Sequence, residues 1–327
     1  MSKNKKRILS GMRPSGRLHL GHLFGALDNW VKLQDEYECY YMVADWHALT
    51  TDYADTSNIK ENTREMVIDW LTAGIDPAKS VIFKQSQVSE HAELHLLLSM
   101  ITPLGWLYRC PTYKEQLQEV SNKDLNTYGF LGYPVLQAAD IMIYKASVVP
   151  VGEDQLPHLE LTREIARRFN GFYGNCLIEP AGLVTKSARV PGIDARKMSK
   201  SYGNAITLAE ESESVKAKVK QMFTDPKKIR ANDPGHPEGC VVCAFHKLYN
   251  TNADSLAEEC KAGKMGCAPC KALLTELLNK ALEPFREKRS KIASDKKLID
   301  EVLEAGQKKA KATAVKTMEE VRTAIKI

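Results

Sequence analysis

The sequence feature that most constrains the fold is the stretch RILSGMRPSGRLHLGH at residues 7–22. Residues 7–10 are predicted to form a short strand. The segment 11–16 is predicted to form a turn, because its glycines allow backbone angles that other residues resist. Apolar side chains then recur at three- and four-residue steps, as in a helix. Such a strand-turn-helix junction favours phosphate, because free N–H groups and the helix dipole point at the ligand.

Two histidines and a glycine lie at this junction. The imidazoles of His19 and His22 are predicted to donate to phosphate oxygens. Gly21 is predicted to leave room for a flat ring or a sugar on the backbone. Two histidines near a glycine also occur by chance, so this motif needs support from elsewhere in the chain.

That support comes from a basic loop, KMSKS, at residues 197–201. Lys197 and Lys200 are compact, mobile charges that suit a triphosphate. Taken alone, the loop would equally be a solvated basic turn.

Short apolar runs alternate with helical patterns along residues 1–194. Strands are predicted at residues 40–44, 80–86 and 148–152, and helices at 59–73, 91–101 and 156–169. This alternation predicts an α/β fold with a doubly wound parallel sheet. In such sheets ligands bind at the carboxyl ends of the strands, where His47 and the GEDQ segment 152–155 are expected. A core histidine is the alternative for His47.

One apolar helix pattern carries the most informative polar residues. Tyr133 and Pro134 are predicted to open this helix, and Gln137 and Asp140 share one face of it. An aspartate inside the run VLQAADIMIY is costly to bury without a partner. Asp140 therefore either caps a nearby helix or accepts a hydrogen bond from an apolar substrate.

Five of the eight cysteines crowd into residues 240–270. In a reducing compartment that density indicates a metal site rather than disulfides. Two residues separate Cys267 from Cys270 and six separate Cys260 from Cys267, which brings three thiolates within reach of one centre. Cys240 is the best fourth ligand. Structural zinc and an iron–sulfur cluster both fit this chemistry, and five free thiols are the remaining alternative.

The bulk composition predicts a soluble, cytoplasmic protein with no membrane association. The 327 residues are 43% hydrophobic and 27% charged, and no run reaches the roughly 20 apolar residues of a membrane span. Residues 195–300 read as a helical domain, and 301–327 as a final helix that packs back on the catalytic domain 1–194. The net charge is +5, and residues 286–327 hold 12 Lys+Arg against 7 Asp+Glu. That basic tail is either a solvated face or suited to RNA.

Together, HLGH and the later KMSKS resemble the two signatures of class I aminoacyl-tRNA synthetases. The segments GMRPSGRLHLGH, ADWHALT, YPVLQAAD and VPVGEDQLPHLELTREIARRFN resemble the tryptophanyl-tRNA synthetases, and the similarity covers essentially the whole chain. Tyrosyl-tRNA synthetases are the nearest relatives. The resemblance implies a Rossmann-like, HUP-type catalytic domain, a helical anticodon-binding domain and a homodimer.

The resemblance also implies a tryptophan–tRNA ligase, which uses ATP with Mg²⁺ to form tryptophanyl-adenylate and then charges tRNA(Trp). Asp140 matches the aspartate that accepts the indole N–H of L-tryptophan. The residues implied in tryptophan binding are Arg13, His47, Tyr133, Gln137, Asp140 and Gln155. The residues implied in ATP binding are Arg13, Pro14, Ser15, His19, Gly21, His22, Gly152, Glu153, Asp154, Val190, Lys197, Met198, Ser199, Lys200 and Ser201. Among these, the implied catalytic groups are His19, His22, Lys197 and Lys200.

The chain departs from the family pattern at two positions of the amino-acid site. Gln137 stands where some members carry methionine, and Arg13 where some carry glutamine, which leaves the packing against indole open. A subset of the family binds a 4Fe–4S cluster with similar cysteine spacing. The ligands implied here are Cys240, Cys260, Cys267 and Cys270, with Cys243 as an extra cysteine. A tyrosine–tRNA ligase, an HxGH-type nucleotidyltransferase that makes a small-molecule adenylate, and a non-enzymatic RNA-binding relative are the alternatives.

Overall fold

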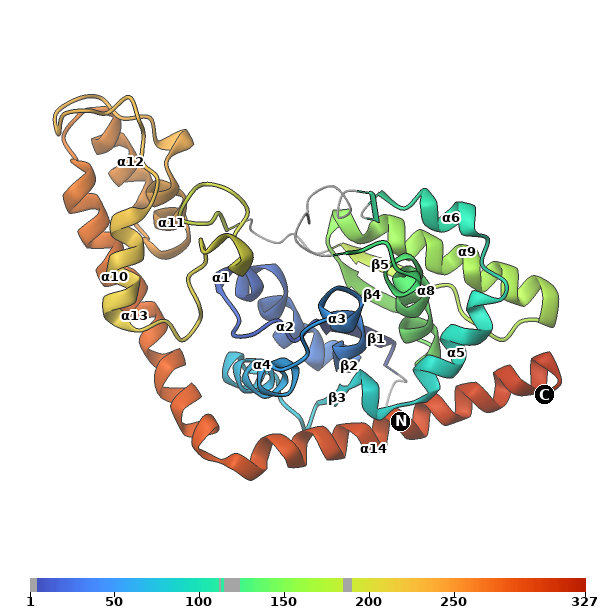
Figure 1. Ribbon diagram of the computed structural model, residues 1–327. Coiled ribbons are helices and arrows are strands. Elements are labelled where there is room, and N and C mark those ends of the chain that lie inside the picture. The colour runs from blue at the N-terminus through green and yellow to red at the C-terminus, as the bar shows by residue number, and fades with distance from the viewer. Residues whose placement is uncertain (1–4, 112, 115–123, 185–189) are drawn as a thin grey trace.

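Five parallel strands form one sheet in the computed structural model, which describes residues 5–111, 113–114, 124–184 and 190–327 (Figure 1). The strands are β1 (Arg7–Met12), β2 (Glu38–Val43), β3 (Ser80–Lys84), β4 (Val148–Val151) and β5 (Ala181–Val184). They lie in the order β3-β2-β1-β4-β5, and every pair is parallel. The direction of strand addition reverses between β1 and β4, so the predicted doubly wound sheet is confirmed.

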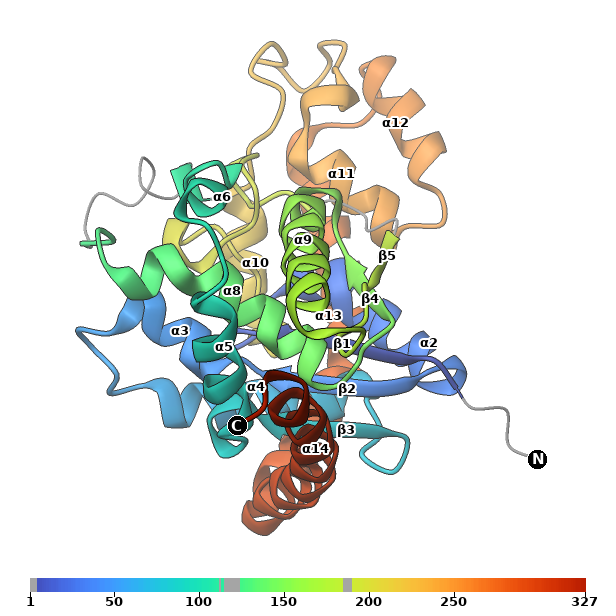
Figure 2. The ribbon, with the colours of Figure 1, turned by 90° about the vertical axis from the view of Figure 1, so that its right-hand side faces the viewer.

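Helices cover both faces of this sheet (Figure 2). They are α1 (Leu20–His22), α2 (Asp28–Glu36), α3 (Asp45–Asp52), α4 (Ile59–Ala73), α5 (Glu90–Ser99), α6 (Leu104–Tyr108), α8 (Tyr128–Ile143) and α9 (Leu156–Tyr173). A π-helical segment, η1 (Leu23–Leu27), joins α1 to α2, and short 3₁₀ turns are η2 (Gln85–Gln87), η3 (Glu153–Gln155) and η4 (Lys200–Tyr202). Single π-turns of this kind are frequent at functional sites.

Apart from β5, whose residues are mostly exposed, the strands are covered on both faces, and their side chains alternate between two apolar clusters. Ile8 and Tyr41 belong to the cluster that includes α2 and α4, whereas Leu9, Tyr40 and Met42 belong to the cluster that includes α5, α8 and α9. This alternation is the two-residue period of a strand. It leaves the carboxyl ends of the strands as the edge open to ligands.

Two elements of the catalytic region differ from the predictions. The helix predicted to open at Tyr133 begins at Tyr128, because the hydroxyl of Thr127 caps its first turn by accepting from the backbone N–H of Phe130 at 3.2 Å. Pro134 therefore lies inside the helix. Strand β5 was not predicted, because its four residues AGLV are mostly exposed and carry no alternating pattern.

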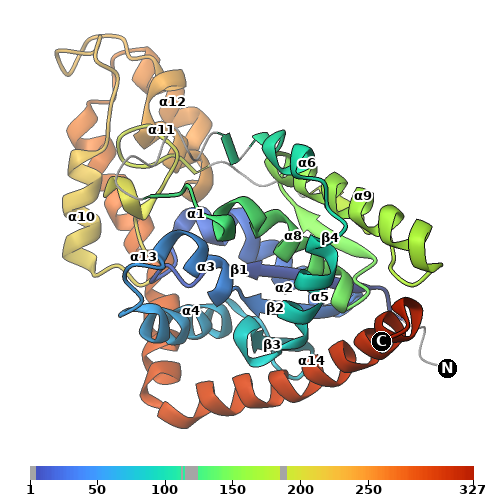
Figure 3. The ribbon, with the colours of Figure 1, turned by 45° about the vertical axis from the view of Figure 1, so that its right-hand side comes forward.

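The C-terminal third is helical. It contains α10 (Ser212–Gln221), η5 (Pro237–Gly239), α11 (Val241–Tyr249), α12 (Ala253–Lys261), α13 (Cys267–Ser294) and α14 (Lys296–Ile325). Helix α13 runs from the α10–α12 group to α4, and α14 then lies along β3 (Figure 3). Gly306 of α14 approaches the backbone of Ile82 so closely that a Cβ atom would overlap it. None of the helices in the described ranges has both the length and the apolar character to cross a lipid bilayer.

Candidate active site

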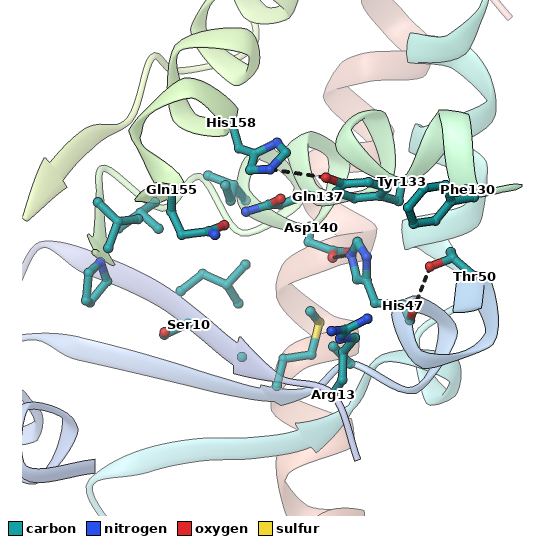
Figure 4. Close-up of a pocket in the computed structure, with 18 residues that line it drawn as sticks. Ser10, Arg13, His47, Thr50, Phe130, Tyr133, Gln137, Asp140, Gln155 and His158 are labelled. Atoms are coloured by element: carbon teal, nitrogen blue, oxygen red, sulfur yellow. Dashed lines mark hydrogen bonds and ion pairs between the residues drawn. The ribbon is translucent and has the colours of Figure 1, made fainter. Parts of the chain in front are cut away.

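A cavity of about 350 Å³ opens at the carboxyl ends of β1 and β4, where α3, α8 and η3 converge (Figure 4). Its volume is in the range of small-molecule pockets, about 300–1,000 Å³. The structure brings together in its lining all the residues implied in amino-acid binding, namely Arg13, His47, Tyr133, Gln137, Asp140 and Gln155. The lining combines apolar side chains from the strands with these few polar groups.

Asp140 is the centre of a buried hydrogen-bond network. Its side chain is 2% exposed. Oδ1 accepts from Nδ1 of His91 at 2.6 Å and from Nε2 of Gln85 at 2.8 Å. Oδ2 accepts from Nε2 of His47 at 2.8 Å and from Nε2 of Gln85 at 3.0 Å. Nε2 of His91 in turn lies 2.7 Å from the hydroxyl of Tyr144. The network therefore joins α3, η2, α5 and α8.

The electrostatics of this network keep Asp140 ionised. Burial alone would raise the pKa of Asp140, but His91 and His47 outweigh it and hold that pKa at about 2. A carboxylate has about four lone-pair sites, and the three donors already fill four contacts. An incoming N–H donor must therefore replace one of them. His47 lines the cavity with a side chain 13% exposed, whereas His91 is fully buried, so His47 is the donor that a ligand reaches.

A second polar pair lines the same cavity. The hydroxyl of Tyr133 lies 3.2 Å from Nε2 of His158, and Nδ1 of His158 lies 3.5 Å from Sγ of Cys110. Burial lowers the pKa of His158. The imidazole of His158 is part of the cavity wall, next to Gln137 and Gln155 (Figure 4).

The two histidines of HLGH form a second, separate cluster at the start of α1. Their rings lie 3.8 Å apart, centroid to centroid, and Nδ1 of His22 accepts the backbone N–H of His19 at 3.2 Å. Burial, with a contribution from Lys200, lowers the pKa of His19 to about 4, and burial with His19 lowers that of His22 to about 3. Both imidazoles are therefore neutral at neutral pH. They can offer an N–H to a phosphate without adding charge.

The imidazole of His19 lies over Gly21. A Cβ atom at this position would lie 2.9 Å from Cε1 of His19. Glycine therefore leaves room for that imidazole, and the predicted contact of Gly21 with a ring or sugar stays a prediction.

The KMSKS loop lies against the first turn. Nζ of Lys200 donates to the carbonyl of Ser15 at 2.9 Å, and burial lowers the pKa of Lys200 to about 8. Lys197 is exposed, and Met198 is 5% exposed in the core. Thr207, just after the loop, pairs with His19 in an antiparallel bridge. The structure therefore brings the two signatures together although Lys197 comes 175 residues after His22 along the sequence.

The remaining residues implied in nucleotide binding surround this junction or the nearby strand ends. Pro14 is buried in the turn, Gly152 to Asp154 follow β4, and Val190 is buried just before the loop. Oδ1 of Asp154 lies 2.6 Å from the position that a Cβ on Gly152 would take, so a side chain there would require the Asp154 carboxylate to move. Ser199 donates its backbone N–H to Asn204 at 2.8 Å. The side chain of Ser201 lies outside the described part of the chain.

Comparison with known proteins agrees with this geometry. A family model described as tRNA synthetases class I (W and Y) matches residues 1–283. A tryptophan–tRNA ligase of Thermotoga maritima is 53% identical, with 98% of this chain and 99% of that protein aligned. One of Aquifex aeolicus is 47% identical, with 98% and 100% aligned. The chain belongs to the tryptophanyl-tRNA synthetase family.

Solved structures place it in the same family. The tryptophanyl-tRNA synthetase of Campylobacter jejuni, complexed with ADP and tryptophan, has a TM-score of 0.88 and 34% identity, covering 98% of this chain and 100% of that one. The tyrosyl-tRNA synthetase of Archaeoglobus fulgidus has a TM-score of 0.67 at 22% identity, covering 88% and 91%, and shares the fold alone. The predicted assignment to the tryptophanyl branch is thus confirmed.

Five of the eight cysteines lie in the helical region. Cys240 precedes α11, Cys260 lies near the end of α12, and Cys267 and Cys270 lie in the first turn of α13. Burial, with the thiols of Cys240, Cys260 and Cys267, raises the pKa of Cys270 to about 12. Within the residues that the structure describes, however, no group of three or more Cys, His, Asp or Glu side chains is arranged to hold a metal ion.

Several side chains that build the site were missed by sequence reasoning. Gln85 and His91 hold Asp140, and Asn204 holds the KMSKS loop by donating to the carbonyl of Lys197 at 3.1 Å and to Asp194 at 2.7 Å. Gln85 lies at the carboxyl end of the strand predicted at residues 80–86, which is a signal for a polar group at the ligand edge. His91 had no such signal, because a histidine on a helix face is most often part of the core.

Proposed function

We propose that this protein activates L-tryptophan with ATP and transfers it to tRNA(Trp). The observation that carries the proposal is the continuity of the cavity with the signature turn. Arg13 lines the cavity, and Ser15, two residues later, is held by Lys200 of the KMSKS loop. An amino acid beside Asp140 therefore lies next to the groups suited to a triphosphate.

Adenylate formation needs no protein nucleophile. A carboxylate oxygen of tryptophan attacks the α-phosphorus of ATP in line, and the bond from that phosphorus to the pyrophosphate oxygen breaks. The protein contributes positioning and charge stabilisation. His19 and His22 donate from neutral imidazoles, and the ammonium groups of Lys197 and Lys200 neutralise the leaving pyrophosphate together with substrate-bound Mg²⁺. A terminal ribose hydroxyl of the tRNA then attacks the adenylate carbonyl and releases AMP.

Selection of tryptophan rests on the ionised Asp140. When tryptophan binds, its indole N–H replaces His47 as a donor to the buried carboxylate. An analogue without that N–H would leave the carboxylate unpaired. Gln137 and Gln155 line the same cavity as this acceptor.

The direct test is tryptophan-dependent exchange of labelled pyrophosphate into ATP, run beside single-turnover charging of tRNA(Trp). We expect exchange with tryptophan and none above background with tyrosine. Exchange with tyrosine alone would contradict the specificity. Exchange without charging would favour a nucleotidyltransferase that makes a small-molecule adenylate.

We further propose that Cys240, Cys260, Cys267 and Cys270 hold a 4Fe–4S cluster, with structural zinc as the alternative. The four-thiol donor set and its spacing along the sequence support the assignment. A centre held there would supply a structural cross-link between α11, α12 and α13. Visible absorption of anaerobically purified protein, with iron and zinc counts, should show one centre. C267S should lose it and C176S should keep it, and the absence of both metals from the wild type would contradict the proposal.

We propose a cytoplasmic homodimer that forms through an apolar surface on α5, α6 and α9. Met100, Leu104 and Phe172 are 70%, 56% and 58% exposed. The guanidinium of Arg168 lies over both Trp106 and Phe172, so α6 and α9 present their aromatic rings side by side. Large exposed apolar patches indicate association. Light scattering should give a dimer for the wild type and a monomer for L104E, and a monomeric wild type would contradict the proposal.

A further inference from the structure

The residue just before HLGH is held by a buried carboxylate. Asp69 of α4 is 1% exposed, and its Oδ2 accepts the backbone N–H of Leu18 at 2.8 Å. Its Oδ1 accepts from Nε of Arg289 at 2.7 Å. Arg289 belongs to α13, lies 220 residues away along the chain, and is 8% exposed. A side chain of the C-terminal helical region thus reaches the support of the nucleotide signature.

A second carboxylate completes this cluster. Oε2 of Glu65, one turn before Asp69 on α4, accepts from Nη2 of Arg289 at 2.7 Å and from Nε of Arg17 at 2.7 Å. Arg289 therefore bridges Glu65 and Asp69 of α4, and these two carboxylates hold residues 17 and 18. The planar guanidinium fits such a double contact, which a lysine ammonium does not reproduce.

The same backbone is tied on its other side to the segment after KMSKS. The carbonyl of Leu18 accepts the backbone N–H of Leu208 at 2.9 Å, and Leu20 donates its N–H to Ile206 at 3.0 Å. The negative charge of Asp69 also acts on Lys200, opposing the effect of burial on its pKa. Asp69 thus supports both signatures at the point where they meet.

Stability alone does not account for this cluster. Taking an arginine and an aspartate out of water is costly, and apolar side chains of similar volume often stabilise a fold as well or better. The chain also spans a long distance to make the contact. Helix α13 has 28 residues, about 42 Å at 1.5 Å per residue, and it starts at the cysteine group.

We propose that Arg289 is a positioning residue for adenylate formation. Through Asp69 it fixes the backbone that carries His19 at the geometry needed for the triphosphate. It thereby makes the nucleotide site depend on how the helical region is seated on α4. This inference rests on the proposed function, and it assigns no contact between Arg289 and substrate.

The test compares R289Q and R289K with K288Q in the full-length protein. K288Q removes the same charge from an exposed neighbour on the same helix. In the exchange assay we expect R289Q to raise the KM for ATP and lower kcat, each about tenfold, with the KM for tryptophan unchanged within about twofold. R289K should recover part of the loss because it keeps the charge, and K288Q should match the wild type.

A second measurement separates positioning from folding and from the proposed function. Calorimetric binding of a non-hydrolysable ATP analogue, well below the unfolding midpoint of each variant, should weaken about tenfold in R289Q and D69N. The double variant should be no weaker than either single variant, since both act through one contact. Analogue binding equal to that of K288Q, or a parallel rise in both KM values, would overturn the inference. A wild type that binds the analogue without tryptophan-dependent exchange would instead overturn the proposed function.

Discussion

The two halves of the active site differ in how completely their polar groups are satisfied. In the amino-acid cavity, Asp140 is held by three donors before any ligand arrives. At the signature turn, Nδ1 of His19 is buried without a hydrogen-bond partner among the described residues, and Lys197 is exposed. A pre-formed network suits discrimination between similar side chains, whereas unsatisfied donors and mobile charges suit a group whose charge moves during reaction. The predictions below test that division.

The largest effect is expected at Asp140. D140N keeps the shape but offers an NH₂ donor to side chains that are already donors, so a buried polar group is left unpaired. We expect kcat/KM for tryptophan to fall roughly 10³-fold or more, with the KM for ATP changed by less than about threefold. D254N, the same change at an exposed position, is the control. A kcat/KM for tryptophan in D140N within tenfold of the wild-type value would contradict the central role of Asp140.

The next effect is expected at Lys200. K200Q removes the ammonium that lies against the first turn, so transition-state charge is less well stabilised. Pyrophosphate exchange should slow by about 10²-fold in kcat while the KM for tryptophan stays the same. K216Q, on an exposed face of α10, should behave as the wild type. A change in the KM for tryptophan as large as the change in kcat would contradict the separation of the active site into an amino-acid half and a nucleotide half.

The pH dependence of the two substrates should differ in the same way. In the proposed mechanism Lys200 acts in its protonated form, and it loses that proton as the pH rises through about 8. kcat/KM for ATP should therefore decline above pH 8, approaching about tenfold per pH unit. His19 and His22 have pKa values of about 4 and 3, so no break is expected between pH 5 and 7. The decline should disappear in K200Q, and its persistence there would assign it to another group.

The smallest effect is expected at Gln137. This side chain lines the cavity but takes no part in the hydrogen bonds that hold Asp140. Q137M, which restores the residue of some relatives, should change kcat/KM for tryptophan by about twofold. A tenfold gain in kcat/KM for tyrosine relative to tryptophan in Q137M would show that specificity extends beyond the hydrogen-bond network of Asp140.

Much of the fold was predictable because its strands and helices are regular in sequence. The runs that became β1 to β4 are continuous and apolar, as in a sheet buried on both faces. Strand β5 was missed because its residues are exposed and few. The start of α8 was misplaced because Pro134 suggested a first turn, while the cap at Thr127 is a single hydroxyl contact.

The sequence was sufficient to predict the residues that face the cavity and the signature turn, but not the residues that hold them in place. HLGH, KMSKS and the cavity residues stand in recognisable motifs. The residues that hold them in place, such as Gln85, His91 and Asn204, are of types that occur in many structural roles, so no sequence motif marks them. Asp69 and Arg289 are further apart in the chain than any local pattern reaches, so only the folded arrangement brings them together.

The last helix has a consequence for how the protein can be handled. Strand β3 ends the sheet on one side, and such a strand offers unpaired backbone groups to other chains unless something covers it. Helix α14 lies along that strand, with Gly306 against Ile82. Truncation of the chain after α13 would expose the edge of β3, where other copies of the protein could then pair strand to strand. The basic C-terminal helix, for which the sequence left a solvated face and RNA binding as alternatives, is therefore expected to protect the edge of the sheet from pairing with other copies.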